Sequence, residues 1–239
     1  MIGIILAGGN GTRFSGHGCC KPLLKINGKY LIEYSLENLV ALGITRAVIV
    51  VGKYRREIID TLGNRYRGIE LDYVTQPKPD GLINALYLAM RESCGQTAVL
   101  QLSDELYVDF DPTVVSTIER CDFLCGYTET QDPQQIKENY SIDCGPGGDI
   151  LRCTEKPDTV TNNKKGTGFC VFQAPCLDLL TTAYGEDPAK IRNIGDYLNL
   201  LIAQGLHGEA VRIACEEINI NTAEKLEYAK HLFEEAKDE

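Results

Sequence analysis

Short apolar runs that alternate with amphipathic segments are the feature that most constrains the fold of this chain. Four runs rich in aliphatic and β-branched residues are separated by stretches with helical periodicity. The runs are 2–6, 47–51, 69–74 and 97–102, and the helical stretches are 31–42, 54–62 and 82–90. Alternation at this spacing predicts βαβ units and a parallel sheet. Because the runs are apolar throughout, helices should cover both faces, which predicts a three-layer αβα, Rossmann-like α/β fold.

The pattern changes in the second half of the chain. Strands are expected at 121–128, 140–143, 150–154 and 169–172, and the sequence GPGGD at 145–149 indicates a hairpin turn. Helices are expected at 175–183, 194–204 and 222–236. Asn221, followed three residues later by Glu224, is a candidate N-cap for the last helix. No linker divides the chain, so we expect a single domain over 1–239 with a mixed, mainly parallel sheet.

Charge and composition exclude several classes of protein. No apolar run approaches the roughly 20 residues that cross a bilayer, and no basic segment precedes the first run, so we expect a cytoplasmic protein without membrane association. The ten cysteines are scattered and the three histidines lie far apart, which favours reduced core thiols and oxygen ligands for any metal. A net charge of −10 disfavours nucleic acid as a partner but allows a local basic site.

A glycine-rich loop, LAGGNGTR at 6–13, directly follows the first strand, and Lys21 comes shortly after it. Glycines let backbone N–H groups approach phosphate oxygens, and Arg13 and Lys21 supply positive charge. The loop is not a Walker A motif, because it lacks Gly-Lys-Ser/Thr. It is not a dinucleotide fingerprint either, because Phe14 stands at the third glycine position and Gly52 ends the second strand. By itself, the loop is also compatible with a plain strand-to-helix turn.

Two cysteines, Cys19 and Cys20, lie in the same segment as Lys21. Nearby positive charge would lower a thiol pKa, so one hypothesis is a reactive thiol whose alkylation inhibits the protein. The alternative is that both thiols are packed and inert.

LAGGNGTRF followed by KPLL resembles the signature loop of the sugar-phosphate nucleotidyltransferases, which join a nucleoside triphosphate to a sugar 1-phosphate. Six further segments resemble that family in the family's order. They are QPKPDGL at 76–82, similar to the base-binding segment of the glucose-1-phosphate thymidylyltransferase branch, LSD at 102–104, EKP at 155–157, GTGF at 166–169, IGD at 194–196 and ININT at 218–222. The resemblance covers nearly the whole chain, and this ordered set is far more specific than any one segment.

The resemblance implies a nucleotide-binding half, 1–110, and a sugar-phosphate-binding half, 111–239. It implies nucleotide contacts from Leu6, Ala7, Gly8, Gly9, Gly11, Thr12, Gln76 and Gly81. It implies Arg13, Lys21 and Asp104 as catalytic residues, and Mg²⁺ held by Asp104 and Asn219. It implies sugar-phosphate contacts from Tyr140, Glu155, Lys156 and Gly168.

The chain also departs from the family. Ser103-Asp104-Glu105 stands where the family often has Gly-Asp-Asn, and Asn219 stands where it often has aspartate, although the N-acetylglucosamine-1-phosphate uridylyltransferase branch has asparagine there. The departures leave open a cytidylyl- or guanylyltransferase for another phosphorylated alcohol or sugar, and a non-catalytic nucleotide sensor. The sequence is compatible with a homo-oligomer and does not identify the sugar.

Two of the implied contacts have open alternatives. The Gln76 amide carries a donor and an acceptor, which match thymine or uracil and favour dTTP or UTP, but a flipped amide would match cytosine. Tyr140 is as compatible with core packing as with a sugar contact.

Overall fold

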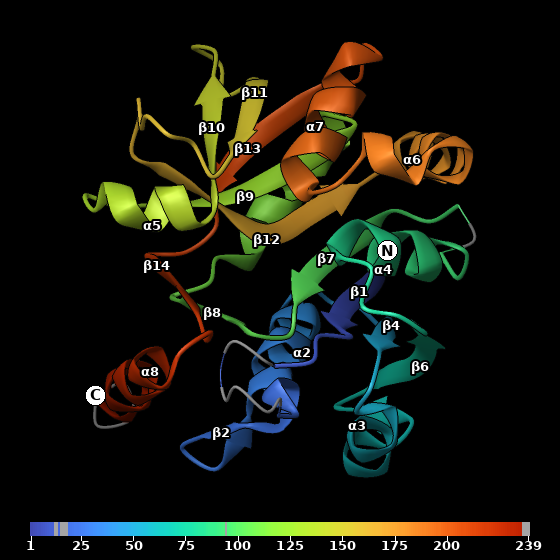
Figure 1. Ribbon diagram of the computed structural model, residues 1–239, viewed down its shortest axis with the longest axis vertical. Helices are drawn as coiled ribbons and strands as arrows, with labels where there is room; N and C mark the ends of the chain where they lie inside the picture. Colours follow the sequence, from blue (N-terminus) through green and yellow to red (C-terminus); the bar gives the residue numbers. More distant parts are fainter. Residues whose placement is uncertain (12–13, 15–18, 94, 236–239) are drawn as a thin grey trace.

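The computed structural model describes residues 1–11, 14, 19–93 and 95–235. A ten-stranded mixed sheet runs through the molecule in the order β11-β10-β12-β7-β1-β4-β6-β5, and β9 and β13 branch from β12 (Figure 1). Strands β6, β4, β1 and β7 are mutually parallel, whereas β12 joins β7 in an antiparallel ladder. The predicted parallel core and the mixed second half are therefore both confirmed.

The elements alternate along the chain as the hydrophobic pattern predicts. The strands are β1 (Ile2–Ala7), β2 (Lys25–Ile26), β3 (Lys29–Tyr30), β4 (Arg46–Val51), β5 (Arg65–Tyr66), β6 (Ile69–Thr75), β7 (Ala98–Leu102), β8 (Glu105–Val108), β9 (Phe123–Glu129), β10 (Tyr140–Cys144), β11 (Ile150–Glu155), β12 (Lys164–Phe172), β13 (Gly208–Arg212) and β14 (Glu216–Asn219). The α-helices are α2 (Leu31–Ala41), α3 (Arg55–Leu62), α4 (Leu82–Met90), α5 (Pro133–Glu138), α6 (Ala174–Glu186), α7 (Ile194–Ala203) and α8 (Ala223–Glu235), and the 3₁₀ helices are η1 (Lys21–Leu23), η2 (Pro112–Arg120) and η3 (Pro188–Lys190). Within the described ranges, no helix is both long and apolar enough to cross a membrane.

Two apolar clusters, one on each face of the sheet, produce the three layers. Along β1, Ile4 packs in one cluster with α4, α6 and α7, while its neighbour Ile5 packs in the other with α2 and α3. Successive side chains of a strand point to opposite faces, so a strand that is apolar at every position is buried on both sides. This is why the uninterrupted apolar runs of the sequence predicted the layers correctly.

Smaller elements were not predicted, because they are too short to show a period. β8 and β14 form a separate antiparallel pair, against which α8 packs in a third apolar cluster. Helix α5 and strand β13 were also missed. The expected cap of α8 was wrong: the helix begins at Ala223, and the Thr222 hydroxyl, not the Asn221 side chain, accepts a hydrogen bond from the Lys225 N–H (3.3 Å).

A buried ion pair connects the second-half sheet to β14. Lys165 Nζ lies 2.8 Å from Glu217 Oε2, and the two side chains are only 4% and 1% exposed. Lys165 also donates to the Glu217 carbonyl (2.8 Å) and to Gln135 Oε1 (3.2 Å), so all three ammonium protons are used. Burial raises the pKa of Glu217, and the Lys165 charge opposes that rise. Each charge therefore depends on the other.

Replacing one residue of the Lys165–Glu217 pair should lower the free energy of unfolding much more than replacing both. Lys165→Met leaves the Glu217 carboxylate buried without a counter-charge, so the free energy of unfolding should fall by about 3–5 kcal/mol, measured by urea denaturation at pH 7. The double variant Lys165→Met/Glu217→Met should recover most of that loss. Arg65→Met, which breaks an exposed pair with Glu70, is the control and should change little. A double variant no more stable than the single one would contradict the expectation.

Candidate active site

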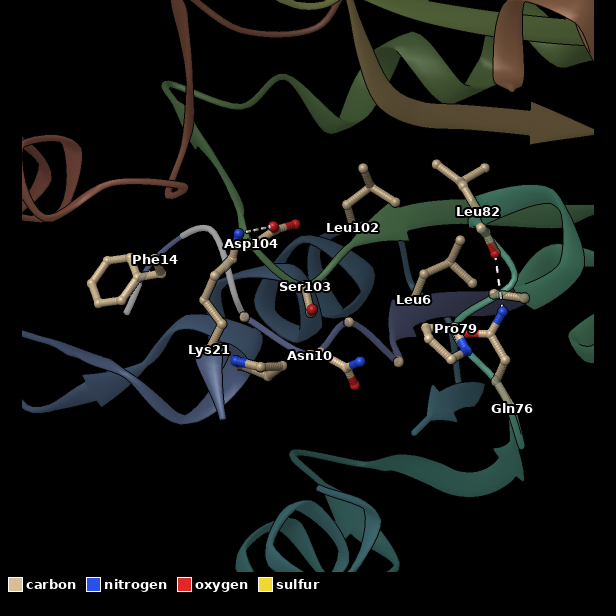
Figure 2. A pocket seen from close by; sticks show the side chains of 16 residues that line it. Leu6, Asn10, Phe14, Lys21, Gln76, Pro79, Leu82, Leu102, Ser103 and Asp104 are labelled. Carbon is tan, nitrogen blue, oxygen red and sulfur yellow. Dashed lines mark hydrogen bonds and ion pairs between the residues drawn. The ribbon is translucent and has the colours of Figure 1, made fainter. Parts of the chain in front are cut away.

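A cleft of about 350 Å³ opens at the carboxyl ends of the parallel strands β1 and β7 (Figure 2). This edge is where open parallel sheets place ligands. Most of the lining comes from the glycine-rich loop, the segment before α4 and the turn after β7. The lining residues are Leu6, Gly8, Gly9, Asn10, Gly11, Phe14, Lys21, Pro22, Gln76, Pro79, Gly81, Leu82, Ala85, Leu102, Ser103 and Asp104. The structure thus gathers residues from four of the predicted segments around one cavity.

Close backbone packing fixes the glycine-rich loop along this cleft. A methyl group on Gly52 would lie 2.4 Å from the Gly8 carbonyl oxygen, so β4 can approach the loop only at a glycine. Gly11 has a φ of +63°, and a methyl group there would lie 2.4 Å from the Cys19 carbonyl oxygen. A methyl group on Gly9, by contrast, would have no atom of the described residues within 4 Å. Gly9 is therefore the glycine whose backbone is left open toward the cleft.

Two of the predicted residues, Thr12 and Arg13, lie outside the described residues. Their expected roles in nucleotide binding and catalysis stay predictions. Ala7, the last residue of β1, is buried in the core and does not line the cleft.

An ion pair between Lys21 and Asp104 lies in the wall of the cleft, as Figure 2 shows. Lys21 begins the short helix η1, and Asp104 lies in the turn between β7 and β8, where its carbonyl accepts a hydrogen bond from the Ile220 N–H (2.9 Å). The two side chains are 14% and 24% exposed. The predicted catalytic lysine and the predicted metal-binding carboxylate therefore face each other, and each neutralises the other.

Gln76 lies at the opposite end of the cleft, and its amide orientation is fixed by its partners (Figure 2). Its Nε2 donates to the Gly81 carbonyl and to Asn84 Oδ1, each at 3.0 Å. Its Oε1 lies beside Gly8, where an added methyl group would be 2.7 Å away. Because the Gly81 carbonyl can only accept, a flipped Gln76 amide would lose that bond. Asn84, which sequence reasoning missed, contributes to this orientation from the first turn of α4.

Asn219 reaches the Asp104 turn through the β8–β14 pair. It is the register partner of Glu105, the residue after Asp104. It lines a second cavity, of about 360 Å³, together with Lys165 and Glu217, and not the first one. Among the described residues, no three His, Cys, Asp or Glu side chains gather as a metal cluster. The Asp104 carboxylate in the turn and the Asn219 amide at the adjoining end of β14 have the oxygen ligands that fit a cation such as Mg²⁺, which takes most of its ligands from water and phosphate.

Glu105 is a buried acid directly beside the Asp104 turn. Its pKa is raised to about 8, first by burial and then by the nearby Glu217 carboxylate. Sequence reasoning noted Glu105 only as a departure from the family pattern.

The predicted sugar-side residues differ in their surroundings. Glu155 ends β11 next to the first turn of α7, since a methyl group on Gly195 would lie 3.6 Å from its backbone nitrogen. Burial raises the pKa of Glu155, and Lys156 opposes the shift. Lys156 is exposed, with a left-handed φ of +43°, and its N–H donates to the Asn139 carbonyl (2.8 Å). Glu155 and Lys156 therefore lie at a strand end whose backbone is held by neighbouring segments, and they are not an isolated ion pair on the surface.

Tyr140 has the contacts of a packing residue. Its side chain is buried, and its hydroxyl donates to the Thr167 carbonyl (2.7 Å) and lies 2.9 Å from the Cys125 sulfur. Its ring fills the space beside Gly166, where a methyl group would be 2.2 Å away. These contacts favour the packing alternative over a sugar contact for Tyr140.

The thiol hypothesis is wrong for Cys20. Burial raises the pKa of this thiol to about 11, so it is not activated by the neighbouring positive charge. The local sequence indicated only the charge and could not indicate the burial. Cys20 packs among apolar neighbours of the α2 and α3 side, as the alternative expected.

Comparison with known proteins identifies the family to which the chain belongs. The profile of the nucleotidyl transferase family matches residues 2–214, and the chain belongs to that family.

Among named relatives, the chain is 30% identical over 187 residues to the low-salt glycan biosynthesis nucleotidyltransferase Agl11 of Haloferax volcanii, covering 75% of this chain and 51% of Agl11. It is 25% identical to the UTP–glucose-1-phosphate uridylyltransferase AglF of the same organism, covering 98% and 97% of the two chains. It is 29% identical to the glucose-1-phosphate thymidylyltransferase of Xanthomonas campestris, covering 74% and 61%. The chain thus spans about half of Agl11 but nearly all of AglF.

Solved structures support the same fold. A UDP-glucose pyrophosphorylase complexed with UDP-glucose superimposes with a TM-score of 0.84 at 19% identity, covering 98% of both chains. The ligand-free UDP-glucose pyrophosphorylase superimposes with a TM-score of 0.80, covering 99% and 100%. At this identity the likeness concerns the fold alone.

Two glycine substitutions should separate loop packing from ligand access. Gly52→Ala forces the Gly8 carbonyl away from β4, so it should destabilise the protein by about 1–3 kcal/mol, as overpacking does. Gly9→Ala has room for its methyl group and should leave the melting temperature unchanged, but should weaken nucleotide binding because Gly9 lines the cleft and the ligand would approach its backbone. Calorimetry and titration with UTP measure the two effects. Equal nucleotide affinity in Gly9→Ala and the parent would contradict the placement of the ligand.

Proposed function

We propose that this protein is a sugar-1-phosphate nucleotidyltransferase. The observation that carries the proposal is the cleft in which a glycine-rich loop, Lys21 and Asp104 meet at the ends of β1 and β7. Relatives named as glucose-1-phosphate uridylyl- and thymidylyltransferases support the substrate class. An oxygen of the sugar 1-phosphate attacks the α-phosphorus of the triphosphate, the bond from that phosphorus to the bridging oxygen breaks, and pyrophosphate leaves.

This reaction needs positioning and charge stabilisation, and no covalent enzyme intermediate. The backbone of Gly8, Gly9 and Gly11 would hold the triphosphate, and Arg13 would neutralise the departing pyrophosphate. Lys21 would move its ammonium group from Asp104 to the α-phosphate. That exchange keeps Lys21 paired with a negative group and frees an oxygen of Asp104.

Asp104 and Asn219 would hold Mg²⁺, a role that their carboxylate and amide oxygens fit. When bound, the ion supplies positive charge to the triphosphate oxygens. Asp104 would give the only formal negative charge of this pair, and Asn219 would contribute a neutral oxygen.

The fixed amide of Gln76 supports uracil or thymine as the base. Because Nε2 is engaged by Gly81 and Asn84, the atom left for a ligand is Oε1, an acceptor. The N3–H of uracil or thymine can donate to Oε1, whereas cytosine could donate only through its exocyclic N4 amino group, because its N3 is an acceptor. A site shaped around the N3 edge would therefore favour uracil or thymine over the cytosine of the cytidylyltransferase alternative.

The sugar 1-phosphate would lie between the Asp104 turn and the second half of the sheet. Glu155 would contact sugar hydroxyls and Lys156 the sugar phosphate. Gly168 would not contact the sugar, because it is buried, lines neither cavity and has Leu102 and Glu105 where a side chain would stand. Tyr140 is left out of this site because its hydroxyl is already engaged in the core.

The base preference can be tested by pyrophosphate release with five nucleoside triphosphates against a panel of sugar 1-phosphates. UTP or dTTP should exceed CTP by at least about 10²-fold in kcat/KM, since the wrong base leaves buried polar groups unpaired. Asn84→Leu should narrow that ratio, because one of the two acceptors that orient Gln76 is lost, while Asn84→Asp keeps an acceptor and should preserve it. Faster turnover with CTP or GTP would refute the base assignment. Nucleotide binding without any turnover would favour the sensor.

If Asp104 and Asn219 hold the metal, changing the acid to an amide and changing the amide to an acid should affect the rate differently. Asp104→Asn leaves the site with no protein carboxylate and should lower the rate about 10²–10³-fold. Asn219→Asp should retain activity and tighten metal binding, and Asn219→Ala should lie between these. Turnover is measured against Mg²⁺ concentration, with the melting temperature as a check on folding. An Asp104→Asn protein as active as the parent at low Mg²⁺ would rule out Asp104 as the ligand.

A further inference from the structure

Glu105, the residue after Asp104, has two well-formed partners that the mechanism above does not use. One carboxylate oxygen, Oε2, accepts hydrogen bonds from the Gly168 N–H and from the Tyr107 hydroxyl, each at 2.7 Å. The residue is only 3% exposed and lines neither of the two cavities. It cannot touch a ligand, so any role in the reaction must act through the residues that it holds.

The hydrogen bond from the Gly168 N–H to Glu105 takes the place of a hydrogen bond to a neighbouring strand. β7 pairs with β12 from Ala98 to Leu100, opposite Phe172 to Cys170. β7 then turns away, while β12 continues past Gly168 and pairs with β10 at Lys165. Between these two ladders, no described strand pairs with Gly168 on that side. The Glu105 carboxylate supplies the acceptor that a strand would otherwise provide.

The same residue is tied to the other predicted metal ligand. Glu105 is the first residue of β8, and its register partner in β14 is Asn219. Asp104 precedes Glu105 in the chain, and its carbonyl accepts from Ile220, the residue after Asn219. Glu105 thus joins Asp104, Asn219 and Gly168 through one covalent bond, one register pair and one hydrogen bond.

Glycine is needed on the opposite side of this contact. A methyl group on Gly168 would lie 2.4 Å from Leu102 Cγ and 2.9 Å from Glu105 Oε2. The Glu105 side chain and the strand can therefore approach this closely only with glycine at 168.

We propose that Glu105 is a positioning residue that sets the distance between strand β12, at Gly168, and the Asp104 turn, and so between the two halves of the chain that would hold the two substrates. Its carboxylate aligns the bound sugar 1-phosphate with the triphosphate without touching either. This inference rests on the proposed function for its kinetic consequence. The hydrogen bond to Gly168 itself does not depend on that function.

Kinetics of two substitutions test the role. Glu105→Ala removes the acceptor and should lower kcat/KM for the sugar 1-phosphate by about 10²-fold, as small misplacements do, while KM for the triphosphate changes less than about threefold. Glu105→Gln keeps an acceptor oxygen at the same chain length and should stay within about threefold of the parent for both substrates. Glu105→Gln as damaging as Glu105→Ala, or an unchanged sugar 1-phosphate kcat/KM in Glu105→Ala, would overturn the proposal.

A matched control separates positioning from general destabilisation. Glu209 is another buried carboxylate with two hydrogen bonds, both from Arg120 (2.8 and 2.6 Å), and it belongs to β13, away from the cleft. Glu209→Ala should lower the melting temperature without shifting either KM. The same fall in sugar 1-phosphate kcat/KM in Glu209→Ala would show that the kinetic effect reports stability alone and would overturn the proposal.

Amide hydrogen exchange provides a readout without turnover. In Glu105→Ala, exchange of the Gly168 N–H should accelerate at least about tenfold, and Glu105→Gln and Glu209→Ala should leave it protected. Protected exchange in Glu105→Ala would overturn the positioning role. If no sugar 1-phosphate reacts with any triphosphate but exchange responds as expected, the proposed function fails and the structural role of Glu105 stands.

Discussion

The antiparallel ladder between β7 and β12 is the constraint on which the arrangement of the site depends. Three register pairs, from Ala98–Phe172 to Leu100–Cys170, join the parallel half of the sheet to the second half. Past these pairs β7 and β12 diverge. The cleft opens beside the point where they diverge, and the Asp104 turn follows β7. β12 is also paired with β9 near both of its ends, which holds β12 in place beside this opening. The two halves are thus placed by a sheet and not by a linker.

Two lysines show how burial decides whether an ion pair is permanent or exchangeable. The Lys165–Glu217 pair is nearly fully buried, and separating it would leave an uncompensated charge in the core. The Lys21–Asp104 pair lies in a cleft wall that water and ligands reach, so its separation costs much less. In a chain with a net charge of −10, such an exchangeable lysine can attract an anionic substrate without standing unpaired before it arrives.

The sequence predicted the parts of the structure that are set by local pattern. The apolar run of β1 and the segments around Lys21 and Asp104 were placed correctly, since period and motif spacing carry that information. What depends on distant partners was not predicted. The fixed polarity of Gln76 is imposed by the Gly81 carbonyl and Asn84, and the engaged hydroxyl of Tyr140 by strands β9 and β12. Strands of four residues, such as β8 and β14, have no readable period.

Glycine serves a related purpose in the two halves of the chain. Gly52 lets β4 approach the loop at Gly8, and Gly168 lets β12 pack against the Glu105 side chain. In both places the side chain is absent because another group needs its space, not because the backbone requires a left-handed conformation. Glu105 and Gly168 are 63 residues apart, yet a change in the size of either side chain would affect the other residue. A side chain at 168 would displace the carboxylate, and a shorter side chain at 105 would leave a buried N–H without an acceptor, at a cost of about 1–3 kcal/mol.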